Sequence, residues 1–229
     1  MFQIVNPLVS EAISNNDKNR LEDLLKKSSM SLFLISGLIF LLINTNIGEI
    51  YNVVESINKI QGYSIAIPVV LIISISKLYT STIGCMNNII SNSNFYQYIL
   101  FFSIFSALSL FFLNIYFIEN IGLIGAAYST LIIIVVFNLL KIILVLVKLK
   151  IQPYSINSIK LFFIITVLYL IFSNLEFDFL SAISSLIIKS IIISIIYMSI
   201  CYYLNISKEI NNVINSFIKK IRPEKGNQA

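Results

Sequence analysis

The chain has 229 residues, of which 57% are hydrophobic and only 12% are charged, and its mean hydropathy is +0.88. Soluble domains carry roughly 25% charged residues, and a soluble core of this length has too little interior to hide so many apolar side chains, so the composition excludes an ordinary soluble domain. The net charge of +5 does not indicate nucleic-acid binding, because the basic residues stand beside apolar segments, as in the cytoplasmic loops of membrane proteins.

Six apolar segments are candidates for crossing a membrane. A spanning helix needs about 20 apolar residues, and open sheet edges are not tolerated in lipid. The segments run, in chain order, over residues 28–43, 63–83, 96–117, 122–147, 159–173 and 180–204. We therefore expect an all-α bundle of about six transmembrane helices.

The segments that flank the predicted spans are amphipathic. Near the start, Leu21, Leu24 and Leu25 form a short apolar stripe among charges. Near the end, apolar residues recur at helical spacing, which predicts a helix lying on the cytoplasmic leaflet. That second stripe consists of Ile206, Ile210, Val213, Ile214, Phe217, Ile218 and Ile221. The chain thus divides into a cytoplasmic segment (1–27), four spans (28–147), two further spans (148–204) and a basic cytoplasmic tail (205–229).

The distribution of basic residues predicts the orientation. Of the 16 Lys and Arg residues, 13 lie in the first segment, around the fourth and fifth spans, or in the tail. The connections on the opposite side hold only Lys59 among five acidic residues. This asymmetry predicts an even number of spans with both termini in the cytoplasm.

Apart from Lys141 and Lys160, which count with the basic connection around the fourth and fifth spans, two charged side chains lie within the predicted spans. Such residues are functional candidates because charge is costly in lipid. Lys77 lies near Ser74 and Ser81 in the second span, and this face is predicted to line a watery cavity and to meet an anionic ligand. Lys189 lies within the sixth span and is predicted to face a cavity or a lipid headgroup. The alternative for either lysine is that it reaches back to the headgroups. No Asp or Glu lies within a predicted span, so the sequence indicates no coupling-ion site.

The sequence predicts no catalytic residue, metal site or cofactor. There is no histidine, which excludes Ser-His and Cys-His nucleophilic catalysis. Cys85 and Cys201 are far apart in the chain and have no metal-like spacing. We therefore expect a protein that is not an enzyme.

Small residues open the fourth predicted span. Gly122 with Ala126, and Gly125 with Ser129, are spaced so that two helices can approach closely in lipid. Helix packing is the favoured interpretation of this pattern, and a direct ligand role is the alternative.

The same region carries a family resemblance. The stretch ENIGLIGAAYSTL resembles a recurrent pattern of polysaccharide flippases in the multidrug/oligosaccharidyl-lipid/polysaccharide exporter superfamily. The matching residues are Asn114, Gly122, Gly125, Ala126, Ala127 and Thr130. The opening of the chain, with Asn6, Pro7 and Asp17 before a long span, is also similar.

The resemblance implies a two-lobed flippase fold of which this chain is the carboxy-terminal portion. Residues 28–147 would correspond to the later part of the carboxy-terminal lobe, and residues 148–204 to two appended helices. Such proteins export lipid-linked polysaccharide repeat units across the bacterial cytoplasmic membrane by alternating access. Lys77 and Lys189 would then attract the pyrophosphate of an undecaprenyl-pyrophosphate-linked oligosaccharide. The missing amino-terminal half would be a partner, together with membrane lipids, and the chain would be a fragment of a longer transporter.

Three alternatives stay open at this point. A drug-efflux member of the same superfamily would use cation-binding carboxylates, which the predicted spans lack. A non-transporting membrane scaffold or assembly subunit would purify with a stable partner. A membrane polymerase or glycosyltransferase is disfavoured by the lack of histidine and of a large polar loop.

Overall fold

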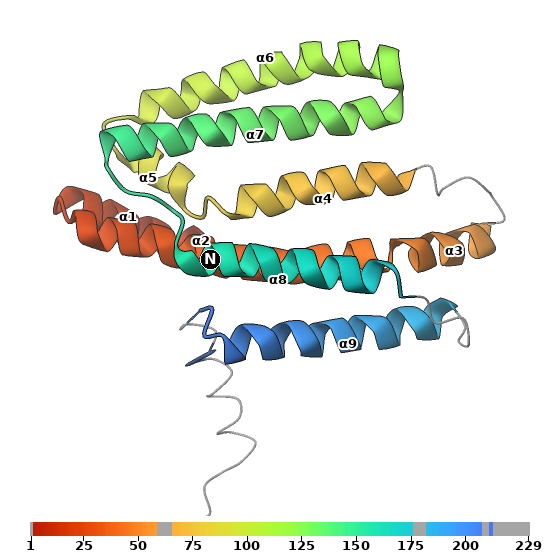
Figure 1. The fold of residues 1–229 in the computed structure, drawn as a ribbon. Helices are drawn as coiled ribbons and strands as arrows, with labels where there is room; N and C mark the ends of the chain where they lie inside the picture. The colour runs from red at the N-terminus through yellow and green to blue at the C-terminus, as the bar shows by residue number, and fades with distance from the viewer. Residues whose placement is uncertain (1, 59–65, 176–181, 208–210, 213–229) are drawn as a thin grey trace, which may run out of the picture.

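The computed structural model describes residues 2–58, 66–175, 182–207 and 211–212, and all regular structure in these ranges is helical (Figure 1). The helices are α1 (Phe2–Ser14), α2 (Lys18–Thr45), α3 (Ile47–Asn58), α4 (Ile67–Ser81), α5 (Met86–Asn92), α6 (Tyr96–Ile121), α7 (Leu123–Lys148), α8 (Ile156–Ser173) and α9 (Ala182–Tyr203). Five of them, α2, α6, α7, α8 and α9, are long and apolar enough to cross a membrane. A sixth crossing results if α4 and α5, which meet at a bend of 50°, count as one broken span. The expected all-helical, multi-pass architecture is therefore confirmed. Of the six predicted spans, five correspond to such helices, or six if the broken span is counted.

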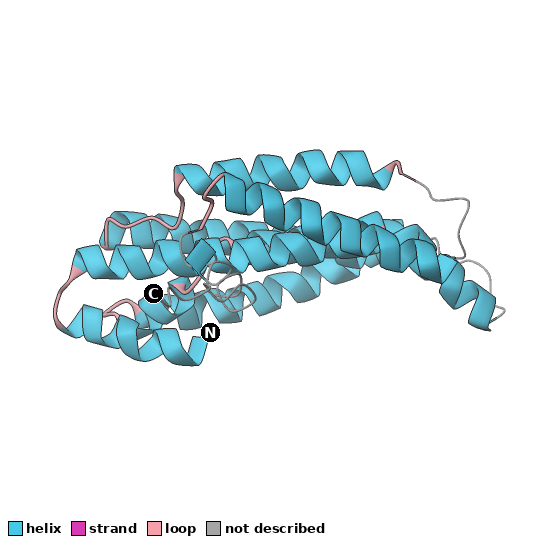
Figure 2. Ribbon diagram, turned by 90° about the horizontal axis from the view of Figure 1, so that it is seen from below, coloured by secondary structure: helices cyan, strands magenta, loops and turns pink. Residues whose placement is uncertain are grey.

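The long helices lie alongside one another, and their direction alternates in chain order (Figures 1 and 2). In Figure 1, α6 and α7 form one hairpin, α4 lies beneath it, α2 and α8 follow, and α9 covers the far side. α2 contacts α4, α8 and α9, and therefore forms the centre of the bundle. The starts of α2, α6 and α8 and the ends of α7 and α9 lie toward the same end of the bundle, which we call the basic end because Lys18, Lys148 and Lys160 lie there.

Residues 2–14 and 18–27 are helical, but the second stretch is the start of the long helix α2 and not a separate element. α1 ends at Ser14, and Asp17 caps α2 by accepting a hydrogen bond from the backbone N–H of Arg20 at 3.0 Å. The Arg20 guanidinium also binds Glu11 of α1 through two bonds of 3.0 Å. α2 therefore begins ten residues before the predicted first span. The apolar stripe at its start is buried in one cluster with residues of α1 and α5, and this burial stabilises the additional turns of helix.

The break between α4 and α5 follows from Gly84. Its φ of +55° lies in the left-handed region, and a Cβ placed there would lie 2.5 Å from the backbone nitrogen of Ser29. The Cys85 N–H donates a hydrogen bond of 3.0 Å to Ser28 Oγ. Only a residue without a side chain allows α2 to approach the break this closely.

The small residues of the fourth predicted span lie at two different places. A Cβ on Gly125 would overlap the carbonyl of Phe117, so α6 and α7 approach closely there. Ser129 is fully buried and hydrogen-bonds Asn114 of α6. Gly122 instead forms the turn between the two helices, with a φ of +64° and open space around it.

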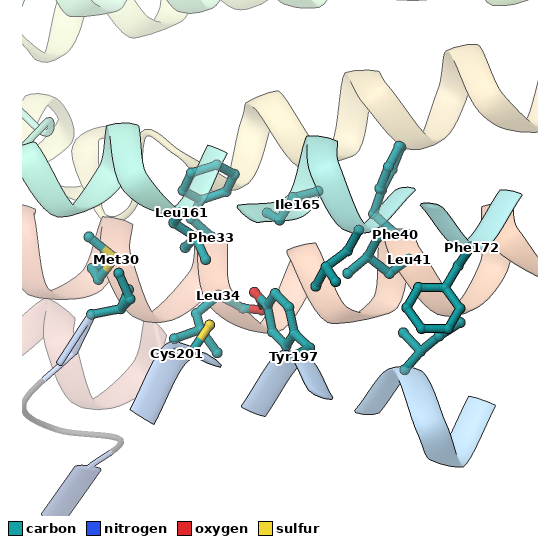
Figure 3. Packing of buried hydrophobic residues seen from close by; sticks show 13 residues of the cluster. Met30, Phe33, Leu34, Phe40, Leu41, Leu161, Ile165, Phe172, Tyr197 and Cys201 are labelled. Atoms are coloured by element: carbon teal, nitrogen blue, oxygen red, sulfur yellow. Dashed lines mark hydrogen bonds between the residues drawn. The ribbon is translucent and has the colours of Figure 1, made fainter. Parts of the chain in front are cut away.

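The largest apolar cluster joins α2, α8 and α9 (Figure 3). Phe33, Leu161 and Ile165 are among its buried members, and the Tyr197 hydroxyl donates a hydrogen bond of 2.8 Å to the Leu34 carbonyl. Because lipid tails are as apolar as these side chains, close packing and this hydrogen bond hold the helices together rather than the hydrophobic effect. The last two predicted spans are thus packed onto the first span.

The predicted amphipathic helix of the tail falls almost wholly outside the described residues. Of its apolar stripe only Ile206 is described, and it is buried in the α2–α8–α9 cluster.

Candidate functional site

The two candidate lysines, Lys77 and Lys189, occupy different environments. Lys189 of α9 is buried with only 2% of its side chain exposed, whereas Lys77 of α4 is exposed. α2 and α8 lie between α4 and α9 (Figure 1). The two ammonium groups therefore do not share one site within this chain.

Lys189 forms an ion pair with Glu49. Its Nζ lies 3.1 Å from Glu49 Oε1, and the glutamate side chain is only 18% exposed. Glu49 lies in the first turn of α3, where a negative charge is favourable for the helix. An isolated charge at this depth is costly, so the carboxylate explains how α9 accommodates a buried ammonium.

Buried polar groups surround this pair at the junction of α2 and α3. Asn46, which is 1% exposed, donates from Nδ2 to the Leu42 carbonyl at 2.7 Å and to Ser190 Oγ of α9 at 3.3 Å. Its Oδ1 is buried and has no hydrogen-bond partner among the described residues. The Thr45 hydroxyl bonds back to the Leu41 carbonyl at 2.6 Å. The junction of α2 and α3 is thus linked to α9 by the charged contact of Glu49 and the neutral contact of Asn46.

Sequence reasoning placed Glu49 in a connecting loop and did not predict α3. The signal that was available is the acidic residue shortly after the end of a span, at a position suited to a helix N-terminus. Its partner could not be found in this way, because 140 residues separate Glu49 from Lys189.

Lys77 occupies the exposed side of α4. The neighbouring Ser76 is fully buried, and α4 packs against α2 and α7. The exposed residues Ile73, Lys77 and Thr80 recur at helical spacing and define one face, which we call the open face of α4. No described residue forms an ion pair with Lys77.

The two candidate serines beside Lys77 are half-buried and bonded. Ser74 Oγ donates to the Val70 carbonyl at 2.6 Å, and Ser81 Oγ donates to the Leu78 carbonyl at 2.6 Å. Ser81 also contacts the hydroxyl of Ser36 on α2. Ser81 therefore faces the bundle, and Lys77 is the ionisable group of the open face.

Polar groups at the carboxy-terminal end of α4 link it to α7 and to the segment before α8. Asn138 of α7 is buried and donates to Thr80 Oγ1 at 3.5 Å. The hydroxyls of Thr82 and Tyr154 lie 3.3 Å apart. These contacts fix the rotation of α4 and hold the open face outward.

The described residues contain no group of three or more His, Cys, Asp or Glu side chains that could hold a metal ion. Cys85 and Cys201 are both buried, and they belong to different apolar clusters.

Among the described residues, these features define a multi-pass membrane helix bundle with a buried ion pair between Lys189 and Glu49 and an exposed lysine, Lys77, on α4. Comparison with models of protein families, with curated proteins and with solved structures gives no match for this chain. A functional assignment therefore depends on where the charged and polar side chains lie.

Proposed function

We propose that this chain is part of a membrane exporter of lipid-linked oligosaccharides, and that the open face of α4 lines the path of the sugar-pyrophosphate head group. The observation that carries the proposal is the exposure of Lys77 on a helix that packs against α2 and α7.

The argument rests on the cost of an exposed charge in lipid. A lysine at the centre of a spanning helix costs roughly 2.5–3.5 kcal/mol when it faces the bilayer. A helix face that carries Lys77 and Thr80 is therefore better suited to a water-filled cavity than to acyl chains. A second set of helices, supplied by the amino-terminal half of the transporter, would close this cavity on its other side.

The chemistry of the face favours an anionic cargo. Lys77 has no acidic partner among the described residues, so its ammonium is free to bind a phosphate oxygen. Pyrophosphate is the charged part of an undecaprenyl-pyrophosphate-linked oligosaccharide, and the resemblance of residues 114–130 to polysaccharide flippases supports the same cargo. A drug-efflux role would instead require a carboxylate on this face.

The proposal includes a topology. α4 and α5 form one broken span, which gives six crossings with both termini in the cytoplasm of a bacterium. The gathering of Lys18, Lys148 and Lys160 at one end of the bundle supports this orientation.

A chromosomal substitution tests the proposal in cells that make the polysaccharide. We expect Lys77→Gln to reduce surface polysaccharide and to cause lipid-linked repeat units to accumulate, and we expect Lys77→Arg to retain most export. Lys160→Gln, which removes an exposed lysine at the start of α8, is the matched control. Normal export by Lys77→Gln at equal protein abundance would refute the role of Lys77.

A further inference from the structure

A small cavity opens at the basic end of the bundle, away from the open face of α4. Its volume is about 200 Å³, and it lies where the turn between α1 and α2, the residue after α5 and the end of α7 meet. Lys18, Lys148 and Asp17 supply its charged groups, and Asn16 and Ser93 add polar ones.

The two lysines of this cavity differ from the other basic residues at the start of α2. Arg20 is paired with Glu11, Lys26 with Glu22 and Lys27 with Asp23. Lys18 and Lys148 form no ion pair with a described residue. Two unpaired ammonium groups from distant parts of the chain therefore line one cavity.

The single carboxylate of the cavity is already engaged. Asp17 Oδ1 accepts the hydrogen bond of 3.0 Å from the Arg20 N–H that caps α2. The cavity thus has a formal charge of +1, from Lys18 and Lys148 against Asp17, and its free hydrogen-bonding groups are mainly donors suited to an anion.

The depth of the cavity matches the level of lipid headgroups. The apolar part of α7 ends at Lys148, whose Nζ lies 6.0 Å from the centre of the Phe95 ring. Tyr96 and Tyr98 follow at the start of α6 and are exposed, as aromatic residues at a membrane interface are. Ala12 and Leu21 make the inner wall of the cavity apolar.

We infer that this cavity binds the phosphate of a membrane glycerophospholipid and prefers an anionic headgroup to a zwitterionic one. The phosphate lies between the ammonium groups of Lys18 and Lys148, and the glycerol lies against the apolar wall. The bound lipid then joins α1, α5 and α7 at a point where few direct polar contacts join them. A volume of about 200 Å³ is too small for an oligosaccharide, so this site is distinct from the proposed export path.

Lipid binding by the purified full chain tests the inference. After delipidation, phosphatidylglycerol, phosphatidylcholine and inorganic phosphate are titrated separately, and binding is measured by native mass spectrometry and by the thermal shift. We expect phosphatidylglycerol to bind most tightly. Because each lysine at a membrane surface contributes about 1 kcal/mol to binding an anionic lipid, Lys18→Gln/Lys148→Gln should weaken this binding about 30-fold.

The control variant, Lys26→Gln/Lys27→Gln, removes the same charge outside the cavity and should leave the affinity for phosphatidylglycerol within about twofold of the parent. Lys18→Gln alone alters only an exposed side chain at the start of α2, so it tests the site even if the double variant does not fold, with an expected loss of about fivefold. Equal affinities of the cavity and control variants would overturn the inference. Inorganic phosphate binding as tightly as phosphatidylglycerol would overturn the assignment to a lipid.

Discussion

Lys189 of α9 is held by Glu49 of α3 at 3.1 Å, although the two residues are 140 positions apart. The pair lies away from the basic end of the bundle, and Tyr197 provides a second link farther along α9 through its hydrogen bond to Leu34. α9 is therefore fixed to α3 and α2 at more than one level.

Loss of the glutamate should destabilise the bundle strongly. Glu49→Gln leaves the Lys189 ammonium buried without a counter-ion, and breaking a buried pair in this way costs about 3 kcal/mol. Glu49→Gln/Lys189→Met removes both charges and should recover most of that loss. The free energy of unfolding, measured in mixed micelles, checks this.

Glu119→Gln, which neutralises an exposed glutamate in α6, is the control and should change stability by less than about 0.5 kcal/mol. If Glu49→Gln behaved like this control, the ion pair would have no structural role.

Gly84 should tolerate no side chain. Gly84→Ala places a Cβ 2.5 Å from the Ser29 nitrogen at a φ of +55°, so we expect a loss of about 2 kcal/mol or more. Gly48→Ala puts a methyl group into open space within α3 and should be neutral or slightly stabilising. Thermal unfolding of the two variants makes the comparison, and equal midpoints would show that the α4–α5 break does not need glycine.

The Tyr197 hydroxyl should contribute measurably to holding α9 on α2. Tyr197 is fully buried, and Tyr197→Phe removes its 2.8 Å hydrogen bond to Leu34 while keeping the ring, for an expected loss of about 1 kcal/mol. Tyr203→Phe changes a residue that is 87% exposed and should have no effect. Hydrogen exchange of α9 amides should rise only in the first variant, and unchanged protection there would argue against the contact.

The helices that the sequence predicted best are those set by local apolar runs. The segments 96–117 and 122–147 correspond to α6 (Tyr96–Ile121) and α7 (Leu123–Lys148), because a long apolar run in lipid has no alternative to a helix. The candidate lysines were found for a similar local reason, since charge is rare within such runs.

The features that were not predicted depend on contacts between distant segments. In the sequence, Glu49 is one of several acidic residues in a predicted loop. Its role becomes visible only when α3 packs against α9. The start of α2 at Lys18 depends on the packing of Leu21 and Leu25 against α1 and α5. Whether a lysine is buried or exposed also depends on the neighbouring helices, so the sequence could not separate Lys77 from Lys189.

Access of water to residue 77 tests the proposed export path most directly. The native cysteines are buried, at 0% for Cys85 and 3% for Cys201, so a membrane-embedded chain carrying Lys77→Cys can be probed with a charged, water-soluble thiol reagent. Ile104→Cys on α6 is the control for a cysteine that faces lipid, because the native side chain is 60% exposed on an apolar surface. The account predicts fast modification at position 77 and almost none at position 104. Equal protection of both cysteines would mean that the open face of α4 meets lipid, which would contradict the proposed path.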